Sequence, residues 1–162
     1  MAEPHAYLNG LSRERAALVL ERCCGARAWV EQMLALRPFA SSEALYGAAE
    51  RVWGELSVDS QLEAFAHHPR IGGSVGDNAL SAKEQAGTAG ADTQLMAALR
   101  AGNVAYEHRF GFVFLVCATG KRADEMLALL TERLTHDRRT ELRIAAAEHA
   151  RITRIRLEGL GA

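Results

Sequence analysis

The chain has 162 residues, a length that suits one domain with a hydrophobic core and is short for two. Hydrophobic residues make up 49% and charged residues 24%, as in an ordinary globular protein. The net charge of −1 offers no general attraction to nucleic acid, and no run approaches the ~20 apolar residues of a membrane span. Nucleic-acid and membrane partners are therefore excluded. Because the N-terminal residues do not resemble a signal peptide, we expect a cytoplasmic protein.

Helical periodicity dominates the chain. Apolar residues recur at spacings of three and four in segments near 12–24, 27–36, 42–54, 59–66, 91–108, 122–134 and 138–158. Ser42, Asp59 and Asp137 are the predicted helix starts. Residues 110–117 alone look like a strand, but a single strand has no partner for its backbone groups. We therefore predict an all-α fold, one compact multi-helix domain over 1–162 with an irregular apolar segment near 110–117.

The cysteines and histidines do not form a metal or disulfide pattern. Three cysteines are an odd number, which argues against a disulfide framework. No His-Glu-x-x-His or Cys-x-x-Cys spacing is present, so we predict no metal site. Gly120-Lys121 follows an apolar run but lacks the first glycine and the Ser or Thr of a phosphate-binding loop.

The most informative stretch runs over 67–73, with the sequence His-His-Pro-Arg-Ile-Gly-Gly. Pro69 biases the residue before it away from the helical region, so His68 is expected on an extended backbone just past a helix. A histidine held in this way is a candidate for proton transfer near neutral pH. The alternative is a helix-stopping loop whose histidine is merely solvated.

A second polar stretch covers Ser81, Ala82, Lys83, Glu84 and Gln85. Its spacing is that of a capping box, in which Ser81 caps a helix and Glu84 reaches back to it. A carboxylate at a helix start near His68 in sequence is also placed to orient an imidazole, while the helix amides hold an anionic group. The spacing alone does not decide between these two roles.

Arg156 interrupts the apolar face of the last predicted helix. Projected at about 100° per residue, one arc carries Leu142, Ala145, Ala146, His149, Ile152, Thr153, Leu157 and Leu160. Arg156 falls within this arc, where a cation is costly unless it is paired, reaches a polar cavity or extends its head to water. The opposite arc carries Arg143, Glu148, Arg151, Arg154 and Glu158, together with an apolar pair, Ile144 and Ile155, that a partner surface could cover.

Taken together, four ordered motifs resemble the OHCU decarboxylases, the 2-oxo-4-hydroxy-4-carboxy-5-ureidoimidazoline decarboxylases of urate degradation. The motifs are His68-Pro69-Arg70-Ile71-Gly72, Ser81-x-x-Glu84-Gln85-x-Gly87, Asn103-x-x-Tyr106-x-x-Arg109-Phe110-Gly111-Phe112 and Ile152-x-x-x-Arg156-Leu157. The resemblance runs over essentially the whole chain. One departure is Val113, which stands where many members have proline.

The resemblance implies an all-α, homodimeric lyase that needs no cofactor and converts OHCU to (S)-allantoin and CO2. It makes His68 the catalytic acid/base, with Glu84 and Arg156 as its partners in the site. Substrate contacts are implied for Pro69, for Ser81, Ala82, Lys83, Glu84 and Gln85, and for Phe114, Leu115, Val116, Cys117 and Ala118.

Two other classes of function fit the same sequence. One is a lyase or hydrolase that acts on another small ureido or imidazole carboxylate at the same site. The other is a helical interaction module without enzymatic activity, which predicts an exposed apolar face and no turnover.

Overall fold

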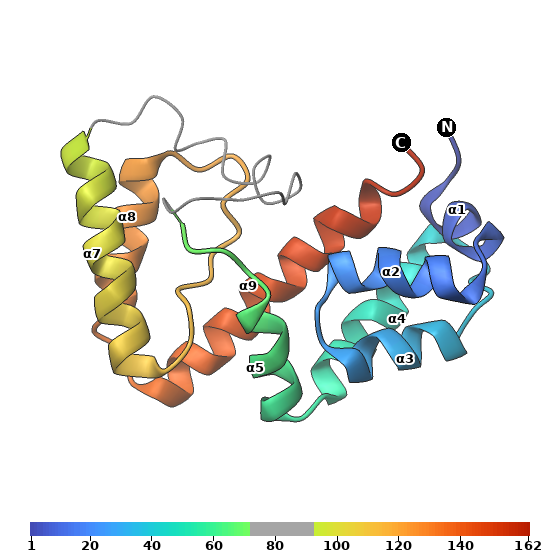
Figure 1. The fold of residues 1–162 in the computed structure, drawn as a ribbon, viewed down its shortest axis with the longest axis horizontal. Coiled ribbons are helices and arrows are strands. Elements are labelled where there is room, and N and C mark those ends of the chain that lie inside the picture. Colours follow the sequence, from blue (N-terminus) through green and yellow to red (C-terminus); the bar gives the residue numbers. More distant parts are fainter. Residues whose placement is uncertain (72–92) are drawn as a thin grey trace. The chain divides into compact units, whose positions relative to one another are not determined.

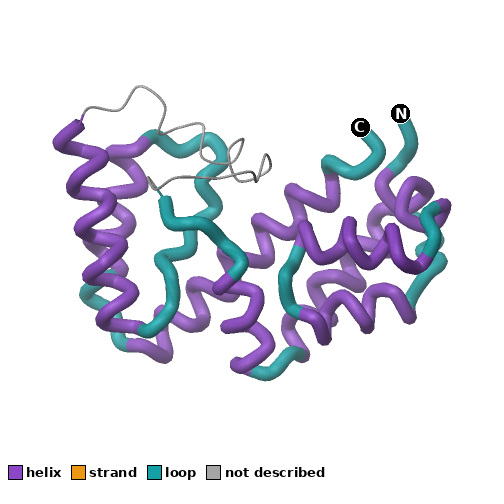
Figure 2. The backbone as a smooth tube through the Cα atoms, viewed as in Figure 1, coloured by secondary structure: helices purple, strands orange, loops and turns teal. Residues whose placement is uncertain are grey.

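The computed structural model of the chain describes residues 1–71 and 93–162, and over these ranges it contains helices and connecting loops but no strand (Figures 1 and 2). The helices are α1 (Pro4–Gly10), α2 (Arg13–Cys23), α3 (Arg27–Ala35), α4 (Ser42–Glu55), α5 (Val58–Ala66), α7 (Thr93–Phe110), α8 (Ala123–Arg133) and α9 (Arg138–Glu158). The all-α prediction is confirmed, and a helix is present in each of the seven segments predicted from periodicity. None of the helices in the described ranges has the length and apolarity needed to cross a bilayer.

Helix α1 was not predicted from the sequence. It has 7 residues and begins with a proline, a residue that is favoured in the first turn because its missing N–H would have no helical partner there. A segment of two turns contains too few residues to show a helical period, which explains why the pattern did not reveal it.

The predicted helix starts are correct to within one residue, but two of the capping side chains differ. Helix α4 begins at Ser42, but the capping oxygen belongs to Ser41, which accepts a hydrogen bond from a backbone amide in the first turn. Helix α5 begins before Asp59, and the hydroxyl of Ser57 accepts the amide hydrogen bond in its first turn at 3.2 Å. Asp137 is confirmed as a start, since its carboxylate accepts from the Thr140 amide of α9 at 2.7 Å.

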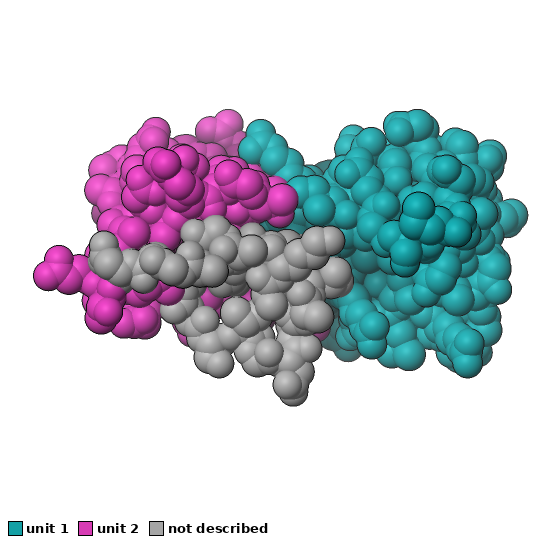
Figure 3. Space-filling model, turned by 90° about the horizontal axis from the view of Figure 1, so that it is seen from above, with its two compact units in different colours: residues 1–64, 150–162 teal, residues 65–149 magenta. Residues whose placement is uncertain are grey.

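The described residues divide into two compact units, residues 1–64 with 150–162 and residues 65–149 (Figure 3). Unit 1 holds α1 to α4, most of α5 and the last part of α9. Its core is built around fully buried side chains, among them Leu8, Leu20, Trp29, Met33 and Leu45. The expectation of one domain over 1–162 stays a prediction.

A side-chain amide holds the loop between α3 and α4 in unit 1. Asn9 donates from Nδ2 to the Phe39 carbonyl at 2.8 Å and accepts from the Phe39 amide at 2.9 Å. One residue on α1 thereby satisfies both backbone groups of a loop residue 30 positions away.

Unit 2 is built on α7 and α8, which lie side by side (Figure 1). Their close approach depends on Gly102, because a Cβ there would lie 2.5 Å from a terminal methyl of Leu130. Gly111 has a φ of +82° and ends α7 with a hydrogen bond from its amide to the Glu107 carbonyl. The chain then crosses to α8 as a loop over 111–122 (Figure 2).

Helix α9 follows the projection at most positions, but Glu148 and Arg154 of the polar arc are half-buried. His149, Ile152 and Leu157 are buried, as their arc predicted. Arg154 was placed among solvated residues, but it ion-pairs with Glu158 at 2.6 Å and lies over the Tyr46 ring at 4.0 Å. It also pairs with Glu43 and Glu50 of α4, because a long arginine side chain on a helix flank reaches the neighbouring helix.

Candidate active site

His67 and His68 follow the last residue of α5 and differ in exposure. The His68 amide donates to the Phe65 carbonyl at 3.1 Å, which folds the chain back at the helix end. The side chain of His67 is exposed, whereas that of His68 is half-buried. Of the two neighbours, the histidine that the sequence selects is therefore the one packed against the protein.

The imidazole of His68 packs against a second imidazole, that of His149 on α9. The ring centroids lie 5.0 Å apart and the rings meet edge to face at 84°. His149 is fully buried and also contacts the Phe65 ring, at 5.9 Å. His149 was not among the predicted site residues. A histidine on an otherwise apolar helical arc was the signal that could have marked it.

The irregular segment after α7 is buried, and its carbonyls are bound by basic side chains. Phe114, Leu115, Val116, Cys117 and Ala118 are each less than 8% exposed. Two donors bind the segment, Arg133 to Leu115 O at 2.5 Å and Lys121 to Cys117 O at 2.7 Å, and Arg138 binds the carbonyl of Phe110, the last residue of α7, at 3.0 Å. Charged hydrogen bonds thus stand in where a neighbouring strand would normally satisfy an extended chain.

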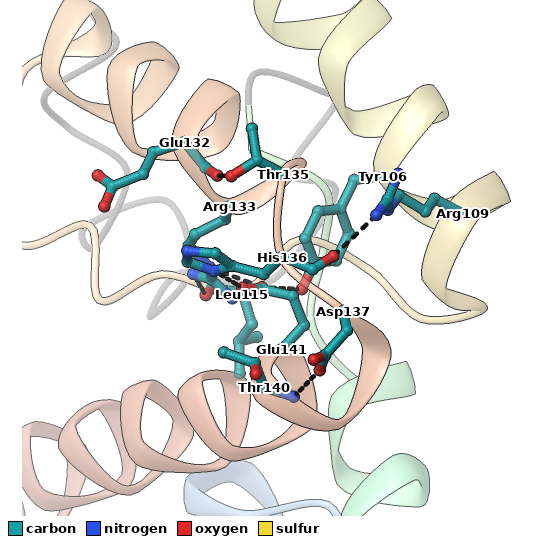
Figure 4. Close-up of polar contacts among 10 residues, drawn as sticks. All are labelled: Tyr106, Arg109, Leu115, Glu132, Arg133, Thr135, His136, Asp137, Thr140 and Glu141. Atoms are coloured by element: carbon teal, nitrogen blue, oxygen red, sulfur yellow. Dashed lines mark hydrogen bonds and ion pairs between the residues drawn. The ribbon is translucent and has the colours of Figure 1, made fainter.

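A buried ionic cluster supports the centre of this segment (Figure 4). Arg133 of α8 is 4% exposed and Glu141 of α9 is fully buried, and their Nε and Oε1 atoms lie 2.8 Å apart. Glu141 Oε1 also accepts from the Tyr106 hydroxyl at 2.5 Å, while Oε2 lies 2.8 Å from His136 Nδ1. Both carboxylate oxygens therefore have partners, as a buried charge requires.

Two further interactions act on the hydrogen-bond donors of the cluster, Tyr106 and Arg133. Burial raises the pKa of the Tyr106 hydroxyl above its usual value, and the hydrogen bond to Glu141 adds to this. Tyr106 thus stays protonated and donates to the carboxylate. The Arg133 guanidinium lies 4.7 Å from the Phe114 ring centre, a cation–π contact with the segment that it supports. The cluster acts on the segment through the Leu115 carbonyl.

The other predicted site residues are Pro69, the stretch 81–85 and Arg156. Pro69 is half-buried and directly follows His68, while Ser81, Ala82, Lys83, Glu84 and Gln85 lie outside the described residues. Arg156 is 8% exposed and donates from Nη1 to the Arg22 carbonyl at 3.0 Å. Arg156 is thus buried and bonded, as its position on the apolar arc required, but it belongs to unit 1 and His68 to unit 2. Their convergence in one site stays a prediction.

Within the described ranges, no group of three or more His, Cys, Asp or Glu side chains is arranged to hold a metal ion. The polar groups found in unit 2 instead suit acid/base chemistry and the positioning of backbone. They comprise a half-buried imidazole at a helix end and a buried segment held by charged hydrogen bonds.

Comparison with known proteins identifies the family. The family model of the OHCU decarboxylases matches residues 9–158, nearly the whole chain. The chain therefore belongs to the OHCU decarboxylase family, a family of carboxy-lyases, as the four motifs predicted.

Individual relatives agree with this assignment. The uric acid degradation bifunctional protein TTL of Arabidopsis thaliana is 37% identical over 85% of this chain, which spans only 45% of that protein. The 2-oxo-4-hydroxy-4-carboxy-5-ureidoimidazoline decarboxylase of Amia calva is 31% identical, over 88% of this chain and 83% of that one. A crystal structure of an OHCU decarboxylase in the presence of (S)-allantoin superposes with a TM-score of 0.75 at 32% identity, covering 85% and 92% of the two chains.

Proposed function

We propose that this chain removes CO2 from OHCU to form (S)-allantoin, with His68 as the acid/base group. The family supports the reaction, and the placement of His68 supports the assignment of the base. Of two adjacent histidines, only His68 is half-buried, precedes Pro69 and packs edge to face on the buried His149. An imidazole held in this way can transfer a proton near neutral pH.

The chemistry of the substrate explains why acid/base groups suffice. OHCU carries a carboxylate and a hydroxyl on one ring carbon, next to an imine-like carbon. When the bond to the carboxylate breaks, CO2 leaves and the electron pair is delocalised into the ring. A proton must then reach the ring from one face, and the protein must orient the carboxylate and stabilise the developing charge. We therefore propose that no metal or organic cofactor takes part.

The remaining roles follow the family resemblance. Glu84 assists His68 in proton transfer, and the guanidinium of Arg156 binds oxygen atoms of the substrate. Pro69, Ser81 to Gln85 and Phe114 to Ala118 contact the substrate, partly through backbone groups. The hydrogen bonds that hold the Leu115 and Cys117 carbonyls support this role for the last segment, because they order the backbone before substrate binds.

We also propose that the active form is a homodimer, as the resemblance implies. The apolar side chain of Ile155 is 36% exposed on the outer arc of α9, and a partner surface would cover it. A cytoplasmic location stays a prediction of the sequence.

Circular dichroism of freshly generated OHCU tests the proposal. Protonation in free solution occurs from both faces and gives allantoin without a net signal, whereas delivery from one face gives the signal of the (S) form. We expect the chain to accelerate this signal, before and after extensive chelation. An unchanged rate of signal formation would reject the reaction, and loss of activity on chelation, restored by one particular ion, would reject the cofactor-free mechanism. Faster turnover of a related ureido acid would favour another substrate of the same chemical class.

A further inference from the structure

The loop that carries His68 contacts α7 at two successive residues. The Arg70 guanidinium pairs with Glu107, with 2.9 Å between Nε and Oε2, and Asn103 donates from Nδ2 to the Ile71 carbonyl at 2.7 Å. Asn103 and Glu107 are four residues apart, so they lie on the same face of α7. We call them the α7 anchor pair.

Asn103 is a polar residue at a buried position of α7. It is 2% exposed, and burying an amide is costly unless it is hydrogen-bonded. Its Nδ2 group donates to Leu99 O at 2.9 Å as well as to Ile71 O, so both amide protons are used and the side chain has one orientation. The Leu99 bond stays within α7. The bond to Ile71 is the one that crosses to another segment, and it supplies a donor to a carbonyl whose residue is 5% exposed.

The same short loop is held from a second side by α9. His68 packs against the fully buried His149, three residues before the carbonyl that Asn103 binds. The ring of His68 and the backbone of Ile71 therefore rest on different helices. Displacement of the loop from α7 would change the angle at which His68 meets its neighbours, and an ångström of misplacement can cost a large part of the rate of an oriented reaction.

We propose that the α7 anchor pair positions His68 for proton transfer. Asn103 holds the loop against α7 through the Ile71 carbonyl, and Glu107 holds it through the Arg70 guanidinium. Their printed contacts are to Arg70 and to the Ile71 carbonyl, two and three residues beyond His68, so both act through the loop. The inference rests on the proposed function, because it takes His68 as the group that moves the proton.

The role of Glu107 is tested by exchanging the charges of Glu107 and Arg70. The Arg70 side chain is 63% exposed and that of Glu107 22%, so solvent screens the pair only in part. Arg70→Glu or Glu107→Arg alone should lower kcat by about two- to fivefold, and the double exchange should restore it. KM should change by less than about twofold, since substrate binding is not the step affected. The control is Glu31→Gln, which breaks a more exposed ion pair with Arg13 in unit 1 and should leave kcat unchanged.

The role of Asn103 is tested by the substitution Asn103→Ala. We expect kcat to fall by about tenfold or more, with little change in KM. Asn9→Ala is the matched control, because Asn9 anchors a loop by the same amide chemistry in unit 1. Both variants should lose thermal stability, but only Asn103→Ala should lower kcat when the assays are run well below the unfolding transition.

Nuclear magnetic resonance of the histidine rings separates positioning from stability. The His68 ring signal is identified by its loss in His68→Asn, and we expect it to shift in Asn103→Ala and in the single charge reversals while the His5 signal stays in place. If kcat and the His68 signal are unchanged, or if the double exchange does not restore kcat, the positioning role is overturned. If Asn103→Ala does not fold, the charge exchange decides. The ring signals need no substrate, so they test the inference even if OHCU is not turned over.

Discussion

At the scale of single residues, the adjacent side chains of His67 and His68 differ in exposure because a proline follows the second. Pro69 cannot continue the helix and disfavours a helical backbone at His68. His68 turns back against His149, whereas His67, still in the turn at the end of α5, points to solvent. A sequence pattern of three residues is thus sufficient to indicate which imidazole is held.

Substitution of His68 by Asn should therefore remove most of the activity and leave the helices intact. General acid–base groups contribute about 10²–10⁴-fold to rate, so a loss of that order is expected in the circular dichroism assay. His67→Asn is the control and should retain nearly full activity. An equal loss in both variants would show that the assignment within the pair is wrong.

A second residue-scale prediction concerns the buried ion pair of Arg133 and Glu141. Arg133→Met leaves the Glu141 carboxylate buried without its main counter-charge, and breaking such a pair costs about 3–5 kcal/mol of unfolding free energy. Denaturation with urea measures this loss. The double variant Arg133→Met/Glu141→Leu should recover part of it, because no lone charge is left in the core.

The control for this prediction is Arg13→Met, which removes one partner of an exposed pair and should change stability little. If Arg133→Met is as stable as the native chain, the Glu141 carboxylate is not held by this pair, and our interpretation of the cluster is incorrect.

At the scale of elements, unit 2 depends on how closely α7 and α8 approach. Glycine lowers helix stability, but at Gly102 it leaves room for Leu130, whose side chain is fully buried and has little freedom to move. The extended segment over 111–122 shows the same dependence on neighbours. It is not paired in a sheet, and the side chains of Arg133 and Lys121 bind two of its carbonyls instead.

Gly102→Ala tests the helix contact. Alanine adds up to about 1 kcal/mol of helix propensity, but overpacking a core typically costs about 1–3 kcal/mol, so we expect a net loss of stability. Gly47→Ala on α4 is the matched change, since nothing lies within 4 Å of its added Cβ, and it should stabilise the protein. Thermal unfolding of the two variants measures the difference. A higher melting temperature for Gly102→Ala would mean that Leu130 yields easily.

At the scale of the whole molecule, the outer arc of α9 offers a place for a second chain. Ile155 is exposed among polar residues, and Ile144 on the same arc is half-buried. A symmetric dimer uses the same face on both chains, so we propose this arc as the contact.

We expect analytical ultracentrifugation to show a dimer at micromolar concentration, and Ile155→Asp to shift it toward the monomer. The control is Leu18→Asp, which places a charge on an exposed apolar residue of α2 and should leave the dimer intact. A monomeric native chain would contradict the proposal. A dimer that survives Ile155→Asp would contradict only the choice of contact.

The sequence by itself determined every described helix except α1, the all-α fold class and the family. Helical periodicity and the histidine–proline stretch are local patterns, since they depend on residues only a few positions apart. The buried position of Arg156 was predicted in the same way, from its place on an apolar arc, and is confirmed.

Only the tertiary structure decided which partner each buried polar side chain binds. Asn103 binds a carbonyl 32 residues away, and Tyr106 binds a carboxylate 35 residues away. Such partners leave no period in the sequence, because the distance between them along the chain is set by loops rather than by helical geometry. A buried asparagine or arginine signals that a partner must exist, but which carbonyl it meets depends on how the helices pack.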